Sequence, residues 1–147
     1  MKHLSIMLFT GLLLIVCIPA TSNAQQAPYT EGSVWAITFV KVKPGMADEY
    51  LRSVASTWKM VNEEAKKQGL VLSYKILSGD AANRDDWDLM LMIEYKNMAS
   101  FDGTDEKFRA ISAKVMGTEE QQKNVYVKRI DIREIFGGKL VRELILK

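Results

Sequence analysis

Apolar residues follow two different spacings along the chain, and the change of spacing separates strands from helices. Residues 34–42 are rich in β-branched and aromatic side chains and end at a Lys-Pro-Gly turn signal at 43–45, which predicts a first strand. Segments 70–78 and 87–95 have the same character and are joined by a polar loop. They predict a hairpin of two further strands.

Between the first and second strands the apolar spacing becomes helical. Apolar side chains recur on one face from Ala47 to Ala65, which predicts an amphipathic helix over 46–68 that ends before a glycine at 69. A second helix is predicted to begin near Thr104, whose hydroxyl we expect to cap it, and to end at Gly117.

The stretch that follows this second helix fits two interpretations. Thr118 with Gln121 resembles a capping box and the glycine pair at 137–138 suits a helix end, which favours a helix. Isoleucines alternate at 130–132, however, and the glycine pair also suits a hairpin turn. We favour the helix because it leaves 139–146 as a single closing strand.

The predicted order, β-α-β-β-α-α-β, indicates an α+β fold in which helices cover one face of an antiparallel sheet. The strands do not alternate between apolar and polar residues, as a sheet with one wet face would. Met90 and Met92 face away from the leucines of their strand, and the first strand likewise has large side chains on one face: Trp35, Ile37 and Phe39. Because helices cover only one face, we expect a second copy of the sheet to cover the other, with Met90 and Met92 in the seam.

This element order, the strand-turn-helix opening at 43–45 and the segment Tyr-Lys-Asn-Met-Ala-Ser-Phe at 95–101 resemble the dimeric α+β barrel superfamily. These are ferredoxin-like domains that pair sheet to sheet, and the resemblance covers nearly all of 25–147. It implies a homodimer. The superfamily includes cofactor-free monooxygenases of the antibiotic-biosynthesis type, haem-degrading enzymes, chlorite-dismutase-like haem proteins and members with no assigned activity, so the fold does not determine the function.

The N-terminal residues predict an export signal. A charged start precedes an apolar run over 4–18, and Ser22 and Ala24 are the small residues that a signal peptidase accepts. The run is shorter than the ~20 residues that cross a bilayer, which argues against a membrane anchor. Valine before Cys17 argues against a lipoprotein. We therefore expect a signal peptide over 1–24 and a periplasmic or secreted protein.

Cleavage after Ala24 leaves a flexible leader over 25–32 and one domain over 33–147. It also removes Cys17 and His3, the single cysteine and histidine of the chain. The mature domain therefore has no disulfide, thiol nucleophile, serine-histidine triad or histidine-bound zinc or haem iron. We expect no cofactor and no metal, and the haem branch of the superfamily is a poor fit.

Charge adds little to the choice of partner. The whole chain carries a formal charge of +2, and cleavage brings it close to zero. Without a basic stripe we expect neither nucleic acid nor, after cleavage, a membrane as partner.

The first predicted helix carries candidate ligand-binding residues. Trp58 and Asn62 are four residues apart, with Tyr50 two turns earlier. A pocket between helix and sheet that holds an aromatic molecule against Trp58, with Asn62 donating a hydrogen bond, would suit a cofactor-free oxygenase. The alternative is that Tyr50 and Trp58 are ordinary core residues, as apolar residues at helical spacing usually are.

Charged residues inside apolar strands are the other candidates. Glu94 and Arg142 suit an acid and an anion clamp in a cavity, or else they lie near strand ends or at a sheet edge. The aspartates at 80–88 suggest calcium, but their spacing lacks the regular ligands of an EF-hand, and we favour a solvated hairpin tip.

The sequence thus predicts an exported homodimer that binds a small, largely apolar molecule between helices and sheet, with cofactor-independent monooxygenase-like activity as its enzymatic form. The alternative is a non-catalytic structural or protein-interaction module.

Overall fold

The structure is a computed structural model of the 147-residue chain, and it describes residues 26–147. The predicted signal peptide over 1–24 and its cleavage site lie outside the described residues.

Four antiparallel strands form one sheet in the order β2-β3-β1-β4. The strands are β1 (Tyr29–Val42), β2 (Ser73–Ser78), β3 (Leu89–Tyr95) and β4 (Arg133–Leu146). This order, with a helical crossover after β1 and another after β3, is the ferredoxin-like arrangement. The predicted α+β class and element order are confirmed.

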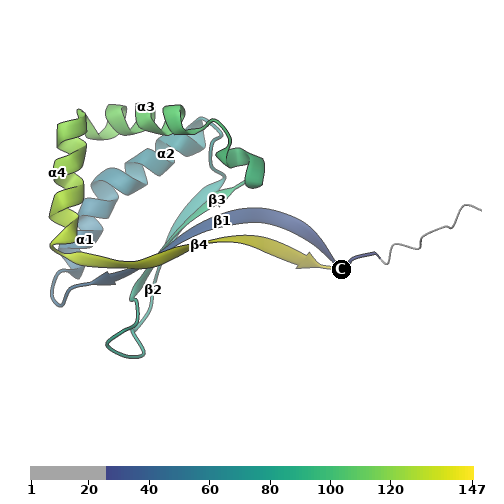
Figure 1. Ribbon diagram of the computed structural model, residues 1–147, viewed down its shortest axis with the longest axis horizontal. Helices are drawn as coiled ribbons and strands as arrows, with labels where there is room; N and C mark the ends of the chain where they lie inside the picture. The colour runs from purple at the N-terminus through teal and green to yellow at the C-terminus, as the bar shows by residue number, and fades with distance from the viewer. Residues whose placement is uncertain (1–25) are drawn as a thin grey trace, which may run out of the picture.

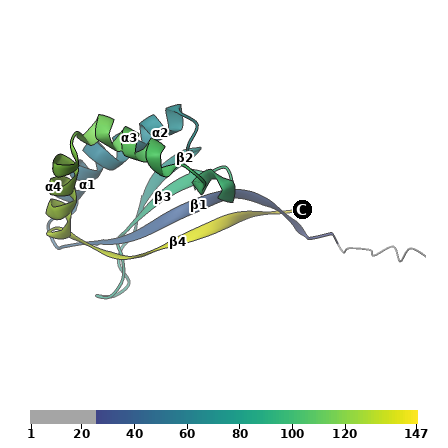
Figure 2. The ribbon, with the colours of Figure 1, turned by 45° about the horizontal axis from the view of Figure 1, so that its top comes forward.

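All helices of the described chain lie on one side of the sheet (Figures 1 and 2). They are α1 (Ala47–Val54), the π-helical turn η1 (Ala55–Lys59), α2 (Met60–Lys67), the 3-10 turn η2 (Met98–Phe101), α3 (Asp105–Met116) and α4 (Glu119–Ile130). The helix predicted over 46–68 is confirmed, although a π-helical turn interrupts it. No helix among residues 26–147 has the length and apolar character to cross a membrane.

The core lies between the helices and the inner face of the sheet, in two clusters. In the first, Tyr50 and Val54 of α1 pack on Val40, Leu89 and Leu91. The second brings α2 and α3 onto the other end of the sheet and contains four buried residues: Ala65, Val71, Tyr95 and Ile111. Each is at most 7% exposed, so the helices exclude solvent from the inner face.

The outer face of the sheet has no layer over it in the described chain (Figure 2). The register places Trp35 opposite Glu94, Ile37 opposite Met92 and Phe39 opposite Met90. We use "outer face" for the five apolar residues of this set: Trp35, Ile37, Phe39, Met90 and Met92. All five are half-buried, and the predicted division of these strands into two apolar faces is confirmed.

The helix favoured after Gly117 is confirmed as α4. Gln121 N–H donates to Thr118 Oγ1 over 3.3 Å and Thr118 N–H donates to Gln121 Oε1 over 2.8 Å, which is the predicted capping box. The predicted cap of α3 is wrong in detail, because the Thr104 hydroxyl donates instead to the Phe101 carbonyl oxygen over 3.3 Å.

The sequence interpretation placed the end of a helix at the glycine pair 137–138, and this placement is wrong. Helix α4 ends at Ile130, and β4 begins at Arg133 and runs through both glycines. The register of β1 and β4 shifts between Phe39 and Val40, and Gly137 has a φ of +134° there. The pair therefore forms a bulge in a long strand.

The boundaries of three strands also differ from the sequence prediction. Segment 25–32 is not all leader, because β1 begins at Tyr29, which pairs with Leu146. Strand β2 begins at Ser73 because the preceding residues close α2, where Leu70 N–H donates to the Ala65 carbonyl oxygen over 2.9 Å. Strand β3 begins at Leu89 rather than at 87.

Candidate functional site

A buried arginine joins α4 to the helix that contains the π-helical turn. Arg129 is 7% exposed. Its Nε donates to Ser53 Oγ over 2.9 Å and its Nη2 donates to the Ser53 carbonyl oxygen over 2.8 Å and to Thr57 Oγ1. The Thr57 hydroxyl donates to the same Ser53 carbonyl oxygen over 2.7 Å. Side-chain bonds to this carbonyl accompany the widened helical turn, and such π-turns occur frequently at functional sites.

The charge of Arg129 has no carboxylate partner within residues 26–147. The ion pairs of these residues join Glu64 with Lys114 and Glu31 with Arg142. Burial lowers the pKa of the Arg129 guanidinium, and the neighbouring Arg133 lowers it further. An arginine nevertheless remains protonated at neutral pH, so this part of the helical layer is electropositive.

A second arginine reinforces this charge. Arg133 lies over the ring of Tyr50, with its guanidinium carbon 5.9 Å from the ring centroid. Its Nε is buried and has no hydrogen-bond partner in the described chain. Burial raises the pKa of the Tyr50 hydroxyl despite both arginines, so Tyr50 stays neutral and does not balance their charge.

Arg129 lines a small cavity between η1, α2, α3 and α4. Its volume is about 90 Å³, and its lining residues are Thr57, Trp58, Val61, Ser112, Met116, Tyr126 and Arg129. We call it the Arg129 cavity. Its lining combines the apolar side chains of Trp58, Val61 and Met116 with hydroxyl groups and the guanidinium.

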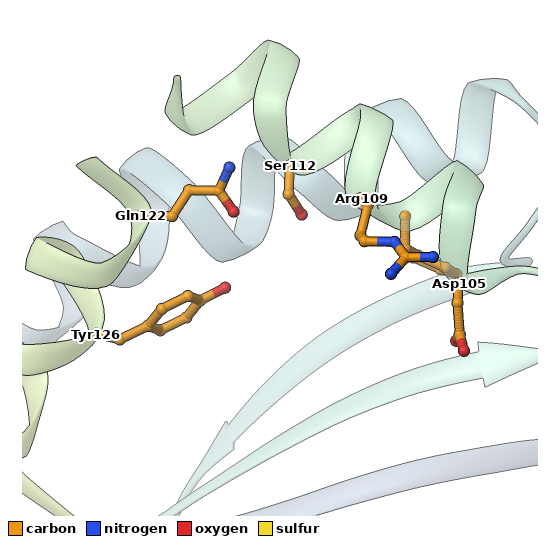
Figure 3. Close-up of a pocket in the computed structure, with 6 residues that line it drawn as sticks. Asp105, Arg109, Ser112, Gln122 and Tyr126 are labelled. Carbon is orange, nitrogen blue, oxygen red and sulfur yellow. The ribbon is translucent and has the colours of Figure 1, made fainter. Parts of the chain in front are cut away.

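The Arg129 cavity adjoins an open cleft between α3 and α4 (Figure 3). We call it the α3–α4 cleft; its volume is about 400 Å³, and its lining residues are Asp105, Phe108, Arg109, Ser112, Gln122 and Tyr126. Ser112 and Tyr126 line both spaces. Asp105, Arg109 and Ser112 project from α3, and Gln122 and Tyr126 project from α4 (Figure 3). The cleft and the cavity together form one candidate site. Its smaller part, the Arg129 cavity, combines apolar side chains with the positive charge of Arg129.

The three candidate residues on the first helix have different positions. Trp58 lines the Arg129 cavity, and its ring also meets that of Tyr74 edge to face, with centroids 5.3 Å apart. Tyr50 is a core residue, 2% exposed. Asn62 is equally buried; its Nδ2 donates to the Trp58 carbonyl oxygen over 2.7 Å, and its Oδ1 has no partner in the described chain. Asn62 therefore orients the backbone at Trp58 and does not line the cavity.

The structure does not bring Glu94 and Arg142 together. Glu94 lies on the outer face near the end of β3, where a hydrogen bond from Ser73 lowers the pKa of its carboxyl. Arg142 lies on the edge strand β4 opposite Val34, on the inner side, and pairs with Glu31. These positions agree with the alternative considered in the sequence analysis: Glu94 lies near a strand end and Arg142 lies at a sheet edge.

The aspartates of the β2–β3 loop bind backbone groups. Asp86 accepts from Ala82 N–H and Trp87 N–H, each over 2.9 Å, and Asp88 accepts from Val42 N–H over 3.1 Å. Among residues 26–147, no group of three acidic, histidine or cysteine residues is placed to hold a metal ion.

The sequence interpretation missed the polar half of the site. Ser112, Tyr126 and Arg129 were not singled out, because the helix favoured for the stretch that carries the last two was not divided into a buried and an exposed face. In the structure, a buried or half-buried stripe runs along this helix at Gln122, Val125 and Arg129 among exposed residues. The available signal was an arginine four residues after Val125, on the same face of the predicted helix.

Comparisons with known proteins give fold likeness only. No family model matches the chain, and no curated protein matches it. A dimeric protein of unknown function with a ferredoxin-like fold, from Bacteroides fragilis, is 15% identical over 78% of this chain and 98% of its own, with a TM-score of 0.41. A dimeric ferredoxin-like protein from an uncultured marine organism is 11% identical over 80% of this chain and 90% of its own, with a TM-score of 0.46. The ferredoxin-like arrangement of this chain follows from its own strand order and helical crossovers.

Proposed function

We propose that the chain is a homodimeric binding domain that holds a small molecule in the Arg129 cavity and the adjoining α3–α4 cleft. The observation that supports this most directly is that the two spaces are neighbours, with Ser112 and Tyr126 in the lining of both. A cleft of about 400 Å³ falls in the range of small-molecule sites, which combine apolar walls with a few polar groups.

Trp58 supplies the apolar wall of this site. Its ring is held from behind by Tyr74, whose hydroxyl in turn donates to Glu63, and Asn62 holds the backbone of the same turn. A rigidly placed aromatic face of this kind favours a flat, largely apolar ligand. The site therefore lies within the helical layer rather than between helix and sheet, where our sequence interpretation had placed it.

A fragment screen followed by thermal shift tests the binding proposal. A ligand of this site raises the melting temperature by mass action, and Trp58→Phe should reduce that rise while the variant stays folded. Trp87→Phe, which alters a ring that packs on Phe39 5.2 Å away, is the matched control and should leave the rise unchanged. Equal responses of the two variants would place the ligand elsewhere. Oxygen consumption with a confirmed ligand then tests for monooxygenase-like activity.

Homodimerisation is proposed from the outer face. It contains five large apolar side chains that no helix of the described chain covers, and a second copy of the same face is self-complementary under two-fold symmetry. Two charged residues, Glu94 and Lys75, lie at the rim of the outer face, and the Lys75 Nζ is 4.2 Å from the Trp35 ring centroid. We expect these charges to limit the dimer seam to the middle of the sheet.

The second candidate function is a non-catalytic assembly module, and the same outer face favours it. Ile37→Lys places a charge in the centre of the seam and should convert the dimer to a folded monomer in sedimentation equilibrium. Met60→Lys, on a 51% exposed residue of α2, is the control and should leave the dimer intact. If the monomeric variant keeps full ligand affinity, assembly and binding are separate; if no ligand is found, the assembly role stands alone.

Export remains our proposal for the N-terminal segment, with cleavage before Gln25. Mass spectrometry of protein expressed with its full N-terminus tests it: the expected product begins at Gln25 and lies outside the cytoplasm. Recovery of the uncleaved chain in the cytoplasm would contradict export.

A further inference from the structure

The Arg129 cavity presents hydrogen-bond donors and no carboxylate. The hydrogen bonds of residues 26–147 occupy Nε and Nη2 of Arg129 but not Nη1. Those bonds also leave the hydroxyls of Ser112 and Tyr126 unengaged, and both line the cavity. None of these three donors is among the buried atoms without a partner in residues 26–147, and Tyr126 is 47% exposed. Water therefore satisfies them in the free protein, and an anionic acceptor that displaces this water bonds to all three.

The electrostatics of the cavity favour a single negative charge. No acidic residue lines the cavity, and Arg133 adds a second cation nearby. Asp105 lies in the cleft, away from the cavity and beside Arg109 (Figure 3). With one guanidinium nitrogen free and apolar side chains in its lining, the cavity suits a monoanion better than a phosphate dianion, which is costlier to desolvate.

The volumes of the two spaces indicate where the head group and the body of a ligand lie. A volume of about 90 Å³ corresponds to roughly three waters at about 30 Å³ each, which admits a carboxylate group but not a carboxylate with a phenyl ring. The body must then extend past Ser112 and Tyr126 into the α3–α4 cleft, where Phe108 offers an apolar surface.

We propose that the Arg129 cavity is the head-group site for a small monocarboxylate whose aromatic or aliphatic body lies in the α3–α4 cleft. The proposal rests on the binding function above and adds the ligand class. Arg129 Nη1 and the Ser112 and Tyr126 hydroxyls donate to the carboxylate, while Trp58 and Met116 exclude water from it.

Paired probes test the ligand class by NMR titration of the ¹⁵N-labelled protein. The probes are 3-phenylpropionate, its neutral counterpart 3-phenylpropan-1-ol, and phenyl phosphate. We expect 3-phenylpropionate to bind at least about tenfold more tightly than the alcohol, since hydrogen bonds to charged groups are the stronger ones. Amides of η1, α3 and α4 should shift on binding.

Variants that leave the structural bonds of Arg129 intact locate the head group. Ser112→Ala and Tyr126→Phe each remove one donor and touch no bond between Arg129 and Ser53 or Thr57, so both should fold and weaken 3-phenylpropionate binding several-fold. Tyr29→Phe, on β1 away from the site, is the control and should change nothing. Arg129→Lys should lose most of the binding; if it does not fold, the hydroxyl variants still decide.

The outcomes separate the ligand class from the binding function. Equal affinity for 3-phenylpropionate and the alcohol overturns the carboxylate proposal and leaves the binding function standing. Tighter binding of phenyl phosphate overturns the monoanion. Binding that both hydroxyl variants retain in full is adventitious binding and overturns the head-group site. No binding of any probe at millimolar concentration overturns the proposal, and a fragment that binds in the screen and is sensitive to Trp58→Phe would still support the binding function.

Discussion

The two faces of the one sheet have similar residues but different surroundings. On the inner face, Val40, Leu89 and Leu91 are at most 7% exposed, because Tyr50 and Val54 of α1 pack on them. On the outer face, equally large side chains such as Ile37 and Phe39 remain half-buried in the described chain. A face this apolar is rarely left in water, and this difference is the basis of our proposal that a second copy covers the outer face.

The helical layer differs from both faces because it combines apolar packing with the buried charge of Arg129, which has no carboxylate partner among residues 26–147. The Arg129 cavity forms where α3 and α4 meet η1 and α2. In our proposal, stability depends mainly on the inner face, assembly on the outer face, and ligand binding on the helical layer. Single substitutions can separate these roles.

The largest effect is expected from truncating the inner core. Ile111→Ala removes a side chain that is 2% exposed, which should lower the free energy of unfolding by about 2–5 kcal/mol. Ile37→Ala, the matched change on the outer face, should cost less in dilute protein and more at high concentration, where the dimer forms. Chemical denaturation at two protein concentrations measures both. A concentration-independent loss for Ile37→Ala as large as that for Ile111→Ala would remove the distinction between the faces.

The next effect concerns the bulge that lets β4 follow β1. A Cβ on Gly138 would lie 2.9 Å from the Ile37 carbonyl oxygen, so Gly138→Ala should lower the free energy of unfolding by about 1–3 kcal/mol through overpacking. Gly79→Ala is the control, since a Cβ added there would meet no other atom within 4 Å, and it should be close to neutral. Equal stability of the two variants in thermal denaturation would show that the close approach is not needed.

Much of this arrangement could be predicted from the sequence. The two apolar faces and the first helix follow from local spacing, and the capping box at Thr118 marks the start of α4. The bulge could not be predicted, because a glycine pair fits a turn, a helix end or a strand equally well. The charged interior was missed for a related reason: whether Arg129 points to solvent or inward depends on how α4 packs on η1, which is a tertiary contact.

A smaller effect is expected at the rim of the outer face. The hydrogen bond from Ser73 lowers the pKa of Glu94, so the bond stabilises the fold above the ordinary pKa of a glutamate and is lost as pH falls through the lowered pKa. Ser73→Ala should raise the pKa of Glu94 and remove less than about 1 kcal/mol of stability at neutral pH. A carboxyl titration by ¹³C NMR measures it; an unchanged pKa of Glu94 would refute the role of Ser73.

The smallest effect is expected at Tyr74, whose ring packs on Trp58, and it is seen only at alkaline pH. Burial and the bond to Glu63 raise the pKa of Tyr74 to about 12, so the phenol stabilises the fold below pH 10 and this contribution is lost as pH rises toward 12. Glu63→Gln should bring the pKa of Tyr74 closer to 10, measured by tyrosine ¹³C NMR. A pKa that stays at about 12 would leave burial as its sole cause.

The most direct test of the two-faced sheet is the solvent exposure of its methionines. With ¹³C-methyl methionine and a soluble paramagnetic probe, we predict that Met90 and Met92 are shielded like core residues at high protein concentration. Met60 and Met98, which are 51% and 48% exposed, should be strongly broadened, and Ile37→Lys should expose Met90 and Met92. Broadening of Met90 and Met92 in the unaltered protein as strong as that of Met60 would contradict a second copy on the outer face.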